Sequence, residues 1–260
     1  MSKRKRPAGR ICFLDEARGF DILLMIAYHA FYTAGWVLNL QTGKDLFRFF
    51  APVEPFFAGV FIFICGVCCR LSRNNFKRGG LLALVAAGIS LALWFFMPDN
   101  MIWFGVLHML AVGILLFALL RPLLDKLPPW LGLALAVVLG VITWHVPGYN
   151  GALFGVPGIW SVPIPEWMRL NPWLYPLGLG QGTLHGTDYF PLLPWLFVFL
   201  AGCYVGVWAK AGKFPRWMSR SHVPFLAAIG RHSLIIYVVH QPVIYGVGWL
   251  ILQVIGRING

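Results

Sequence analysis

Residues 101–120 read MIWFGVLHMLAVGILLFALL, and this stretch carries no charged side chain. Twenty helical residues, rising about 1.5 Å each, cross the roughly 30 Å hydrocarbon core of a bilayer. Six further apolar runs lie on either side of it, at approximately residues 20–40, 51–69, 81–97, 131–144, 192–209 and 233–255. The sequence therefore predicts an all-α protein, a polytopic transmembrane helix bundle of about seven spans.

The composition agrees with a membrane protein. Of the 260 residues 59% are apolar or aromatic and only 12% are charged, whereas soluble domains are about one quarter charged. The formal charge of +12 comes from short basic clusters between apolar runs, which favours a membrane surface over a nucleic acid as the partner. The five cysteines are an odd number and imply no paired disulfide framework.

The distribution of basic residues predicts the orientation of the chain. Fifteen lysines and arginines lie in alternate connections, within residues 3–10, 70–78, 121–126 and 210–220. The opposite connections hold only four, namely Lys44, Arg48, Arg169 and Arg257. Because cytoplasmic loops carry the excess of positive charge, we expect a cytoplasmic N-terminus in a multi-pass protein of the inner (plasma) membrane.

We expect two parts along the chain. Residues 1–19 form a basic cytoplasmic segment, and residues 20–260 form a single transmembrane domain with an extracytoplasmic loop at about 147–190. This loop is rich in proline and glycine, so it is either a surface loop or hides an eighth, re-entrant span. The chain shows no internal repeat and no matched pair of broken helices of the kind that marks many transporters.

The first span contains ionisable residues, each of which costs roughly 2.5 to 3.5 kcal/mol at the centre of a membrane. Arg18 and His29 are eleven residues apart, close to three helical turns, so both project from one face. Asp21 lies on the same stripe, and Asp15 lies one turn before Arg18. Asp15, Arg18 and Asp21 either anchor the helix as an interfacial ion network or form a catalytic group with His29.

Two further histidines, His108 and His240, reach a similar depth in their spans. Each by itself could be a satisfied core histidine, but three imidazoles near the middle of the bilayer favour a polar cavity. Three histidines can also hold zinc with an open fourth position. Because no span carries the paired histidines of the familiar zinc motifs, we expect no metal.

The connection after the second span is unusually basic. Its basic residues could simply reflect the excess of positive charge in cytoplasmic loops, although two or three cations would be enough for that. Alternatively, the segment could bind the phosphates of a nucleotide through side-chain forks and backbone N–H groups. Both interpretations remain open. The candidate ligands are Arg70, Ser72, Arg73, Asn74, Lys77 and Arg78.

Two carboxylates begin spans on the predicted outer side. Glu54 lies at the start of the second span, and Asp188, Tyr189 and Trp195 lie at the start of the sixth. A carboxylate at a helix N-terminus can serve only as a cap. With the neighbouring aromatic rings, these residues are also candidates for binding a sugar acceptor.

Several sequence blocks resemble known membrane acyltransferases. LDEARGFD at 14–21, followed by His29, resembles the opening signature of the acyltransferase-3 family. The blocks FIFICG at 61–66, RLSRNN at 70–75, FGVLH at 104–108, DYFP at 188–191 and GRHSLIIYVVHQP at 230–242 resemble the bacterial branch of the heparan-alpha-glucosaminide N-acetyltransferase catalytic-domain family. Together they extend from about residue 10 to residue 242.

The resemblance implies an integral membrane enzyme that takes an acyl group, usually acetyl, from cytoplasmic acyl-CoA and passes it to an extracytoplasmic sugar or glycoconjugate. It implies His29 as the central residue and adds His108, Arg231 and His240 to the candidate CoA-binding set. In the lysosomal member the histidine usually held responsible follows the first helix, whereas here no histidine occurs between His29 and His108. The match of His29 therefore rests on the acyltransferase-3 pattern.

The residues also support acyl transfer on physical grounds. A thioester is already activated, so the enzyme must align an acceptor, remove its proton and stabilise an oxyanion. A neutral buried imidazole at His29, facing a passage between both sides of the membrane, would accept that proton. The alternative is a proton-coupled transporter or flippase of a small polar or glycolipid substrate, in which the same histidines and aspartates relay protons.

Overall fold

The computed structural model describes residues 10–147, 153–180 and 188–259, so the basic residues 3–6 lie outside the described part. The chain divides into two compact units. The terminal unit comprises Met1–Phe61 and Phe214–Gly260, and the central unit comprises Ile62–Lys213.

The helices confirm the predicted transmembrane bundle. Six helical segments are long and apolar enough to cross a membrane. Three of them are single helices of the central unit, α4 (Asn75–Phe96), α5 (Val106–Leu124) and α8 (Leu192–Lys210), the last with an extended residue at Leu193. The others are α1 (Cys12–Tyr32) with η1 (Thr33–Val37), then α2 (Gln41–Phe50) with η2 (Ala51–Val53) and α3 (Glu54–Leu71), and finally α10 (Ser233–Asn259).

The fifth predicted span corresponds to a shorter apolar helix, α6 (Pro129–Thr143). Two other boundaries differ from the sequence expectation. The first helix begins at Cys12, inside the expected basic segment, and α2 occupies residues expected to form a connection. In both places helical structure includes polar residues that lie outside the apolar run from which the span was predicted.

In the terminal unit α1 packs along α9 (Pro224–Arg231) and contacts α10. Glycines permit the contact between α1 and α9. A Cβ atom on Gly19 would lie 2.0 Å from the carbonyl oxygen of Leu226, and one on Gly230 would lie 1.8 Å from that of Asp15. Since no side chain fits at such distances, the two backbones approach as closely as small residues allow in membrane helix pairs.

Glu16 adds a polar tie between α1 and the start of α9. Its carboxylate is buried and accepts hydrogen bonds from the Ser221 hydroxyl at 2.8 Å and from the backbone N–H groups of His222 at 2.6 Å and Val223 at 2.9 Å. These groups precede Pro224, the first residue of α9. Glu16 therefore satisfies donors at a helix N-terminus, where a negative charge is favourable.

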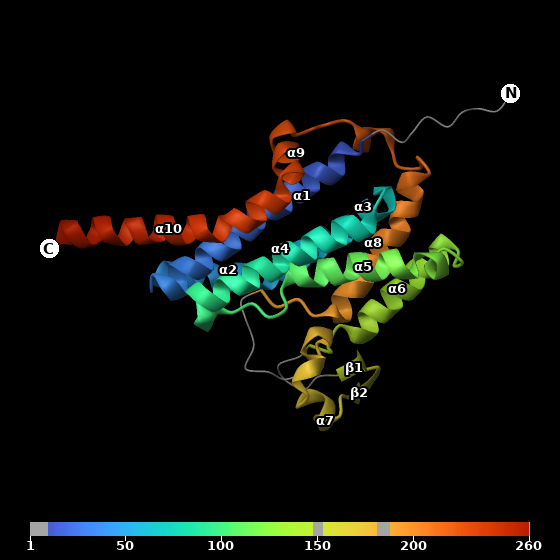
Figure 1. Ribbon diagram of the computed structural model, residues 1–260, viewed down its shortest axis with the longest axis horizontal. Coiled ribbons are helices and arrows are strands. Elements are labelled where there is room, and N and C mark those ends of the chain that lie inside the picture. Colours follow the sequence, from blue (N-terminus) through green and yellow to red (C-terminus); the bar gives the residue numbers. More distant parts are fainter. Residues whose placement is uncertain (1–9, 148–152, 181–187, 260) are drawn as a thin grey trace. The chain divides into compact units, whose positions relative to one another are not determined.

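In the central unit α4 lies beside α5, and α6 lies beside α8 (Figure 1). Glycines again mark a close crossing, between α3 and α8. A Cβ atom on Gly66 would lie 2.0 Å from the carbonyl oxygen of Phe199, and one on Gly202 would lie 2.1 Å from that of Phe63. Fully buried residues fill the interior around this crossing, among them Ile62, Val67, Ile114, Phe117 and Phe199.

The predicted extracytoplasmic loop contains a small folded lobe. An antiparallel hairpin of β1 (Leu153–Val156) and β2 (Trp160–Pro163) precedes α7 (Glu166–Arg169) and η4 (Pro172–Leu177). A minor core of Val146, Ile164 and Leu179 holds the lobe together. Among the described residues of this segment no helix is long enough to form an eighth span.

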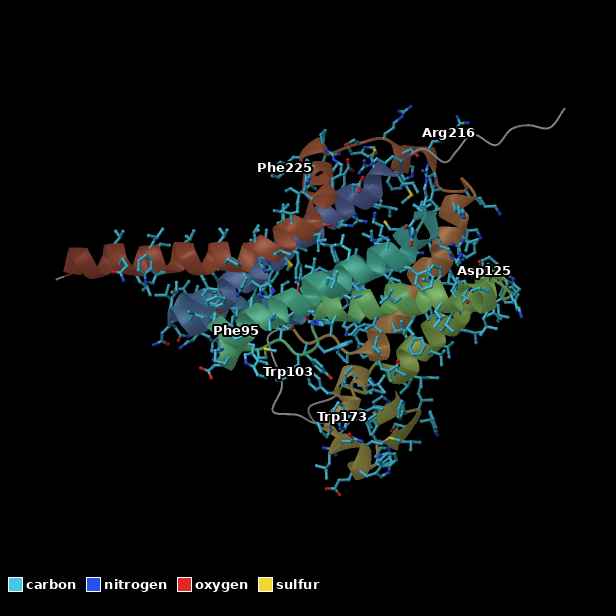
Figure 2. All side chains as sticks on the ribbon, in the orientation of Figure 1. Phe95, Trp103, Asp125, Trp173, Arg216 and Phe225 are labelled. Atoms are coloured by element: carbon cyan, nitrogen blue, oxygen red, sulfur yellow. The ribbon has the colours of Figure 1, made fainter. Side chains whose placement is uncertain are left out.

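Large apolar side chains cover much of the outer surface. On α4 the side chains of Leu84, Phe95 and Phe96 are 73%, 72% and 84% exposed, and Figure 2 shows Phe95 directed away from the helix axis. Monomeric soluble proteins rarely expose contiguous apolar patches of this kind. Together with the six candidate spans, this surface identifies a multi-pass membrane protein whose helices face lipid.

Candidate active site

Two buried imidazoles of the terminal unit, His29 of α1 and His240 of α10, meet where these helices contact each other. Asp21, His29 and His240 are only 5%, 9% and 8% exposed. The ring centroids of His29 and His240 lie 5.0 Å apart, with the ring planes inclined at 51°. The structure thus brings together two of the three histidines predicted to lie deep in the membrane.

Several buried polar atoms of α1, η1 and α10 lack hydrogen-bond partners among the described residues. Among the described residues, Nδ1 of His29, Nε2 of His240 and Oδ2 of Asp21 have no hydrogen-bond partner, and neither have Oγ1 of Thr33 and Oε1 of Gln241. A buried polar group without a partner costs about 1 to 3 kcal/mol. Because native interiors satisfy nearly all such groups, these atoms indicate a place for water or for a ligand's polar groups.

Aromatic rings lie next to His29. The ring of Tyr28 lies edge-on to it at 5.4 Å and also contacts Phe47 of α2 at 4.9 Å and Phe57 of α3 at 6.2 Å. The residue that precedes His29 thus connects α1 to α2 and to the start of α3 through apolar contacts.

The predicted stripe on α1 serves two purposes. Asp15 accepts a hydrogen bond from Nε of Arg10 at 2.7 Å and lies 3.7 Å from the Arg18 guanidinium, which donates to the carbonyl oxygen of Gly230. Asp15 and Arg18 thus tie α1 to its surroundings, as in the anchoring interpretation. Asp21 and His29 lie further along the helix, and both side chains are buried.

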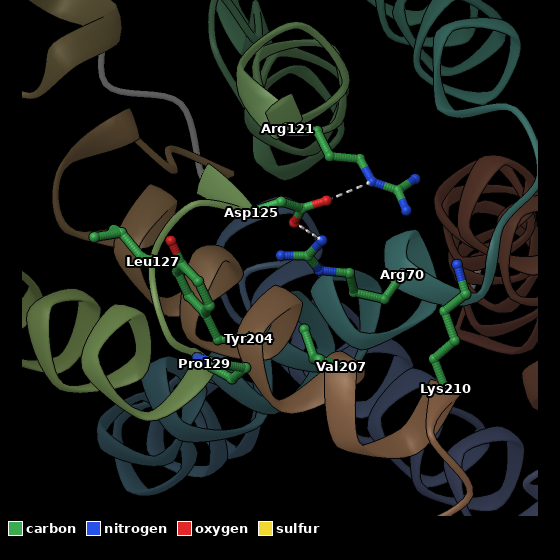
Figure 3. A pocket seen from close by; sticks show the side chains of 8 residues that line it. All are labelled: Arg70, Arg121, Asp125, Leu127, Pro129, Tyr204, Val207 and Lys210. Atoms are coloured by element: carbon green, nitrogen blue, oxygen red, sulfur yellow. Dashed lines mark hydrogen bonds and ion pairs between the residues drawn. The ribbon is translucent and has the colours of Figure 1, made fainter. Parts of the chain in front are cut away.

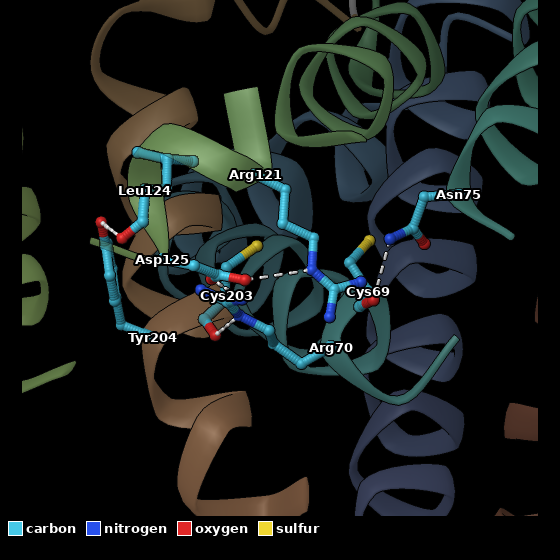
Figure 4. Close-up of polar contacts among 8 residues, drawn as sticks. All are labelled: Cys69, Arg70, Asn75, Arg121, Leu124, Asp125, Cys203 and Tyr204. Atoms are coloured by element: carbon cyan, nitrogen blue, oxygen red, sulfur yellow. Dashed lines mark hydrogen bonds and ion pairs between the residues drawn. The ribbon is translucent and has the colours of Figure 1, made fainter. Parts of the chain in front are cut away.

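The predicted phosphate-binding segment contains one buried arginine, Arg70, and one half-buried arginine, Arg78. The guanidinium of Arg70 pairs with Asp125, donates to the carbonyl oxygen of Cys203 at 3.0 Å and lies 4.9 Å from the centroid of the Phe117 ring (Figure 4). The guanidinium of Arg78 contacts the thiols of Cys65 and Cys69. Both cations are therefore directed into the helix bundle.

The other members of this segment are more accessible. Arg73 and Lys77 are exposed, and Ser72 is half-buried. The side chain of Asn74 caps α4 by accepting a hydrogen bond from the backbone N–H of Lys77 at 2.9 Å. Arg73 and Lys77 are thus the two cations of the segment that can meet a solute without first breaking a buried contact.

Arg70 also lines a cavity of about 270 Å³ in the central unit (Figure 3). Asp125 accepts hydrogen bonds there from Arg70 and from Arg121. Burial opposes ionisation of Asp125, but these hydrogen bonds and the two positive charges outweigh it and lower its pKa below 3.8. The remaining lining residues are Leu127, Pro129, Tyr204, Val207 and Lys210.

Sequence reasoning did not single out Asp125. The pair Arg121 and Asp125, four residues apart at the end of a span, was a signal for it. With three cations around one carboxylate, the cavity has a net positive charge that suits an anionic group.

His108 has partners for both ring nitrogens. Its Nδ1 accepts a hydrogen bond from the backbone N–H of Gly105 at 3.3 Å, and its Nε2 lies 3.2 Å from the hydroxyl of Ser90, which donates to the carbonyl oxygen of Ile102. This arrangement places the proton of His108 on Nε2. His108 therefore ties α4 to the start of α5, in contrast to His29 and His240.

The predicted acceptor residues are distributed over both units. Asp188 is buried and accepts a hydrogen bond from the backbone N–H of Val106, which caps α5. The hydroxyl of Tyr189 donates to the carbonyl oxygen of Tyr175 at 2.7 Å, and Trp195 packs against Trp144. These residues belong to the central unit, whereas Glu54 begins α3 in the terminal unit.

The last two predictions concern Arg231 as a donor-binding residue and the question of a metal. Arg231 is exposed at the end of α9 in the terminal unit. Among the described residues, no group of three or more His, Cys, Asp or Glu side chains is arranged to hold a metal ion.

Comparison with known proteins identifies the family. The model of the heparan-alpha-glucosaminide N-acetyltransferase catalytic domain matches residues 10–242, nearly the whole chain. No curated protein and no solved structure matches the chain significantly. The match includes the first helix with His29 and ends just after His240, so it covers both buried imidazoles. The chain therefore belongs to the heparan-alpha-glucosaminide N-acetyltransferase catalytic-domain family and is a membrane transferase with several transmembrane helices.

Proposed function

We propose that this protein transfers an acyl group, acetyl in keeping with its family, from cytoplasmic acyl-CoA to an extracytoplasmic sugar or glycoconjugate, across the inner (plasma) membrane. The observation that carries the proposal is the buried imidazole of His29, which has an unpartnered nitrogen beside His240 within membrane-spanning helices. An imidazole in such a place is suited to exchange protons with a bound substrate.

The reaction that we propose needs a base and no redox step. His29 takes a proton from the acceptor's hydroxyl or amino group while the acceptor's oxygen or nitrogen attacks the thioester carbonyl. The carbonyl π electrons move to oxygen, and their return expels the CoA thiolate, which takes up the proton from the His29 imidazolium and so restores the base. General-base catalysis typically contributes 10²- to 10⁴-fold to such a step. In this scheme Asp15 and Arg18 hold α1 in place, and Asp21 supplies a polar contact to the substrate.

The donor and acceptor contacts follow the sequence predictions. Arg73 and Lys77 suit the phosphates of CoA, because they are exposed and lie in the segment predicted to be cytoplasmic. The remaining candidates for donor binding are Arg70, Ser72, Asn74, Arg78, His108, Arg231 and His240. Glu54, Asp188, Tyr189 and Trp195 remain the candidates for acceptor binding.

The test is turnover of acetyl-CoA by the purified chain in lipid nanodiscs. We expect release of the CoA thiol, stimulated by glucosamine as the acceptor probe. His29→Ala should lower kcat at least about 100-fold because the base is lost. The matched control is His145→Ala, which changes an exposed histidine and should leave turnover unchanged. Lack of thiol release by the wild-type chain, or full turnover by His29→Ala, would contradict the proposal.

The unpartnered carboxylate oxygen of Asp21 is the observation that favours the alternative, a proton-coupled transporter. That function predicts substrate uptake driven by a proton gradient in vesicles and indifference to acetyl-CoA. Thiol release from acetyl-CoA that depends on His29 would decide for the enzyme.

A further inference from the structure

We propose that His240 is the positioning residue for His29, holding it in the tautomer that can act as a base. This inference rests on the proposed acyl transfer and assigns His240 a task other than donor binding. It starts from the hydrogen bonds that the two imidazoles make and from those that they lack.

The tautomer of His240 follows from its partner. Its Nδ1 lies 2.5 Å from the carbonyl oxygen of Tyr237, one turn earlier in α10. A carbonyl oxygen can only accept, so Nδ1 carries the proton. The structure records no ion pair of His240 among the described residues, and burying an unpaired charge is costly. The ring is therefore neutral, and its Nε2 holds a lone pair.

That lone pair has a complementary neighbour. Nε2 of His240 and Nδ1 of His29 are both buried and both unpartnered among the described residues, and their rings lie 5.0 Å apart. A proton on Nδ1 of His29 makes this atom a donor for which Nε2 of His240 is the acceptor. A small rotation of either ring, or one bridging water, completes the hydrogen bond and removes two unsatisfied groups at once.

The pairing has a chemical consequence for His29. With its proton on Nδ1, the ring presents a lone pair on Nε2, which accepts the acceptor's proton. His29 then becomes an imidazolium, and its Nδ1–H shares the positive charge with the lone pair of His240. A buried carboxylate plays the corresponding role beside the histidine of serine proteases. Here a neutral imidazole does so, which avoids a second charge in the membrane.

Two substitutions separate this role from a structural one. His240→Asn keeps an N–H near the position of Nδ1 and removes the acceptor at Nε2, whereas His240→Gln removes that donor and places an amide oxygen near the position of Nε2. We expect His240→Asn to lower kcat about 100-fold with an unchanged KM for acetyl-CoA, and His240→Gln to retain activity within about tenfold. The control is His232→Asn at an exposed histidine of the same region, with unchanged kinetics.

The opposite order, an active Asn and an inactive Gln variant, would show that only the bond to Tyr237 matters and would overturn the proposal. An increase confined to KM would also overturn it, in favour of donor binding.

A second measurement does not depend on turnover. Nitrogen-15 NMR of the histidine-labelled wild-type chain, assigned with His29→Ala, should show the proton of neutral His29 on Nδ1. A proton on Nε2 overturns the pairing. A wild-type chain that does not release thiol from acetyl-CoA contradicts the proposed function instead, while this spectrum still decides whether the two rings are paired.

Discussion

Arg70 and Arg73 are three residues apart and have different environments. Arg70 is the penultimate residue of α3, so its side chain still projects between helices and meets Asp125. Arg73 follows the end of the helix and is exposed. The same basic segment therefore supplies one residue that stabilises the helix packing and another that the proposed function assigns to the donor.

This difference predicts separate effects of substitution. Arg70→Ala should lower the free energy of unfolding by about 1 to 3 kcal/mol, less than for a fully buried pair because the Asp125 side chain is 44% exposed. Arg73→Ala should leave stability unchanged and raise the KM for acetyl-CoA several-fold, because a contact to the donor's phosphates is lost. Thermal unfolding and donor titration measure the two effects.

The pH dependence provides the control. The pKa of Asp125 is lowered in the folded chain, so its stabilising effect is present above about pH 4 and is lost as the pH falls through the folded-state pKa. The stability difference between wild type and Arg70→Ala should accordingly shrink below pH 4. If Arg73→Ala destabilises the chain while Arg70→Ala changes only KM, then Arg73 is the residue that stabilises the fold and Arg70 the one that binds the donor, contrary to our prediction.

At the scale of helices, glycines fix two crossings, α1 with α9 and α3 with α8. In each crossing both helices contribute a glycine, and each glycine lies against a backbone carbonyl group of the other helix. Side chains of any size would separate the helices and expose the polar groups packed beside them, Asp15 in the first crossing and Arg70 near the second. The crossings therefore support both the anchoring network and the Arg70 pair.

We predict that Gly230→Ala prevents stable folding of the terminal unit, because the new methyl group would lie 1.8 Å from the carbonyl oxygen of Asp15. Gly246→Ala is the matched control, since nothing lies within 4 Å of a Cβ atom at that position on α10. Size-exclusion profiles and unfolding temperatures in detergent compare the two. Equal behaviour of both variants would mean that α9 can shift away from α1 at little cost.

The apolar runs predicted most helices, because the length of a span is set by the thickness of the bilayer. They did not predict α2, whose residues 41–45 read QTGKD and resemble a connection, nor the hairpin within the long loop. Partners far apart in sequence could not be predicted either. The pair Arg70 with Asp125 depends on helix packing that no local pattern encodes, and although three histidines were predicted at similar depth, their sequence positions did not show that His29 meets His240 and not His108.

The whole molecule shows which connections share a side. In the central unit one cavity is lined by Arg70, Arg121 and Lys210. These residues come from three different connections, all of which are predicted to be cytoplasmic, so the three connections do lie on one side. At the opposite end of α5, Asp188 caps the helix beside the segment predicted to be extracytoplasmic. The packing of this unit thus agrees with the alternation that the charge distribution predicts.

We expect cysteine labelling to locate the two sides. Ile159→Cys, at the tip of the hairpin and 86% exposed in the wild-type chain, should react with a membrane-impermeant maleimide in intact spheroplasts. Lys213→Cys, which is also exposed, should react only after permeabilisation. The wild-type chain, with its five native cysteines, gives the background. Labelling of Lys213→Cys first would place the N-terminus outside.

The shortness of α6 has a consequence for the surrounding lipid. It begins with Pro129 at the cavity and ends next to Trp144, which packs on Trp195 near the start of α8, so its 15 residues follow much of the path taken by the 19 of α8. A helix of that length measures about 22 Å, well below the usual hydrocarbon thickness. Acyl chains beside its exposed valines and leucines must therefore compress, so this edge of the protein favours thin, short-chain bilayers and draws headgroups inward.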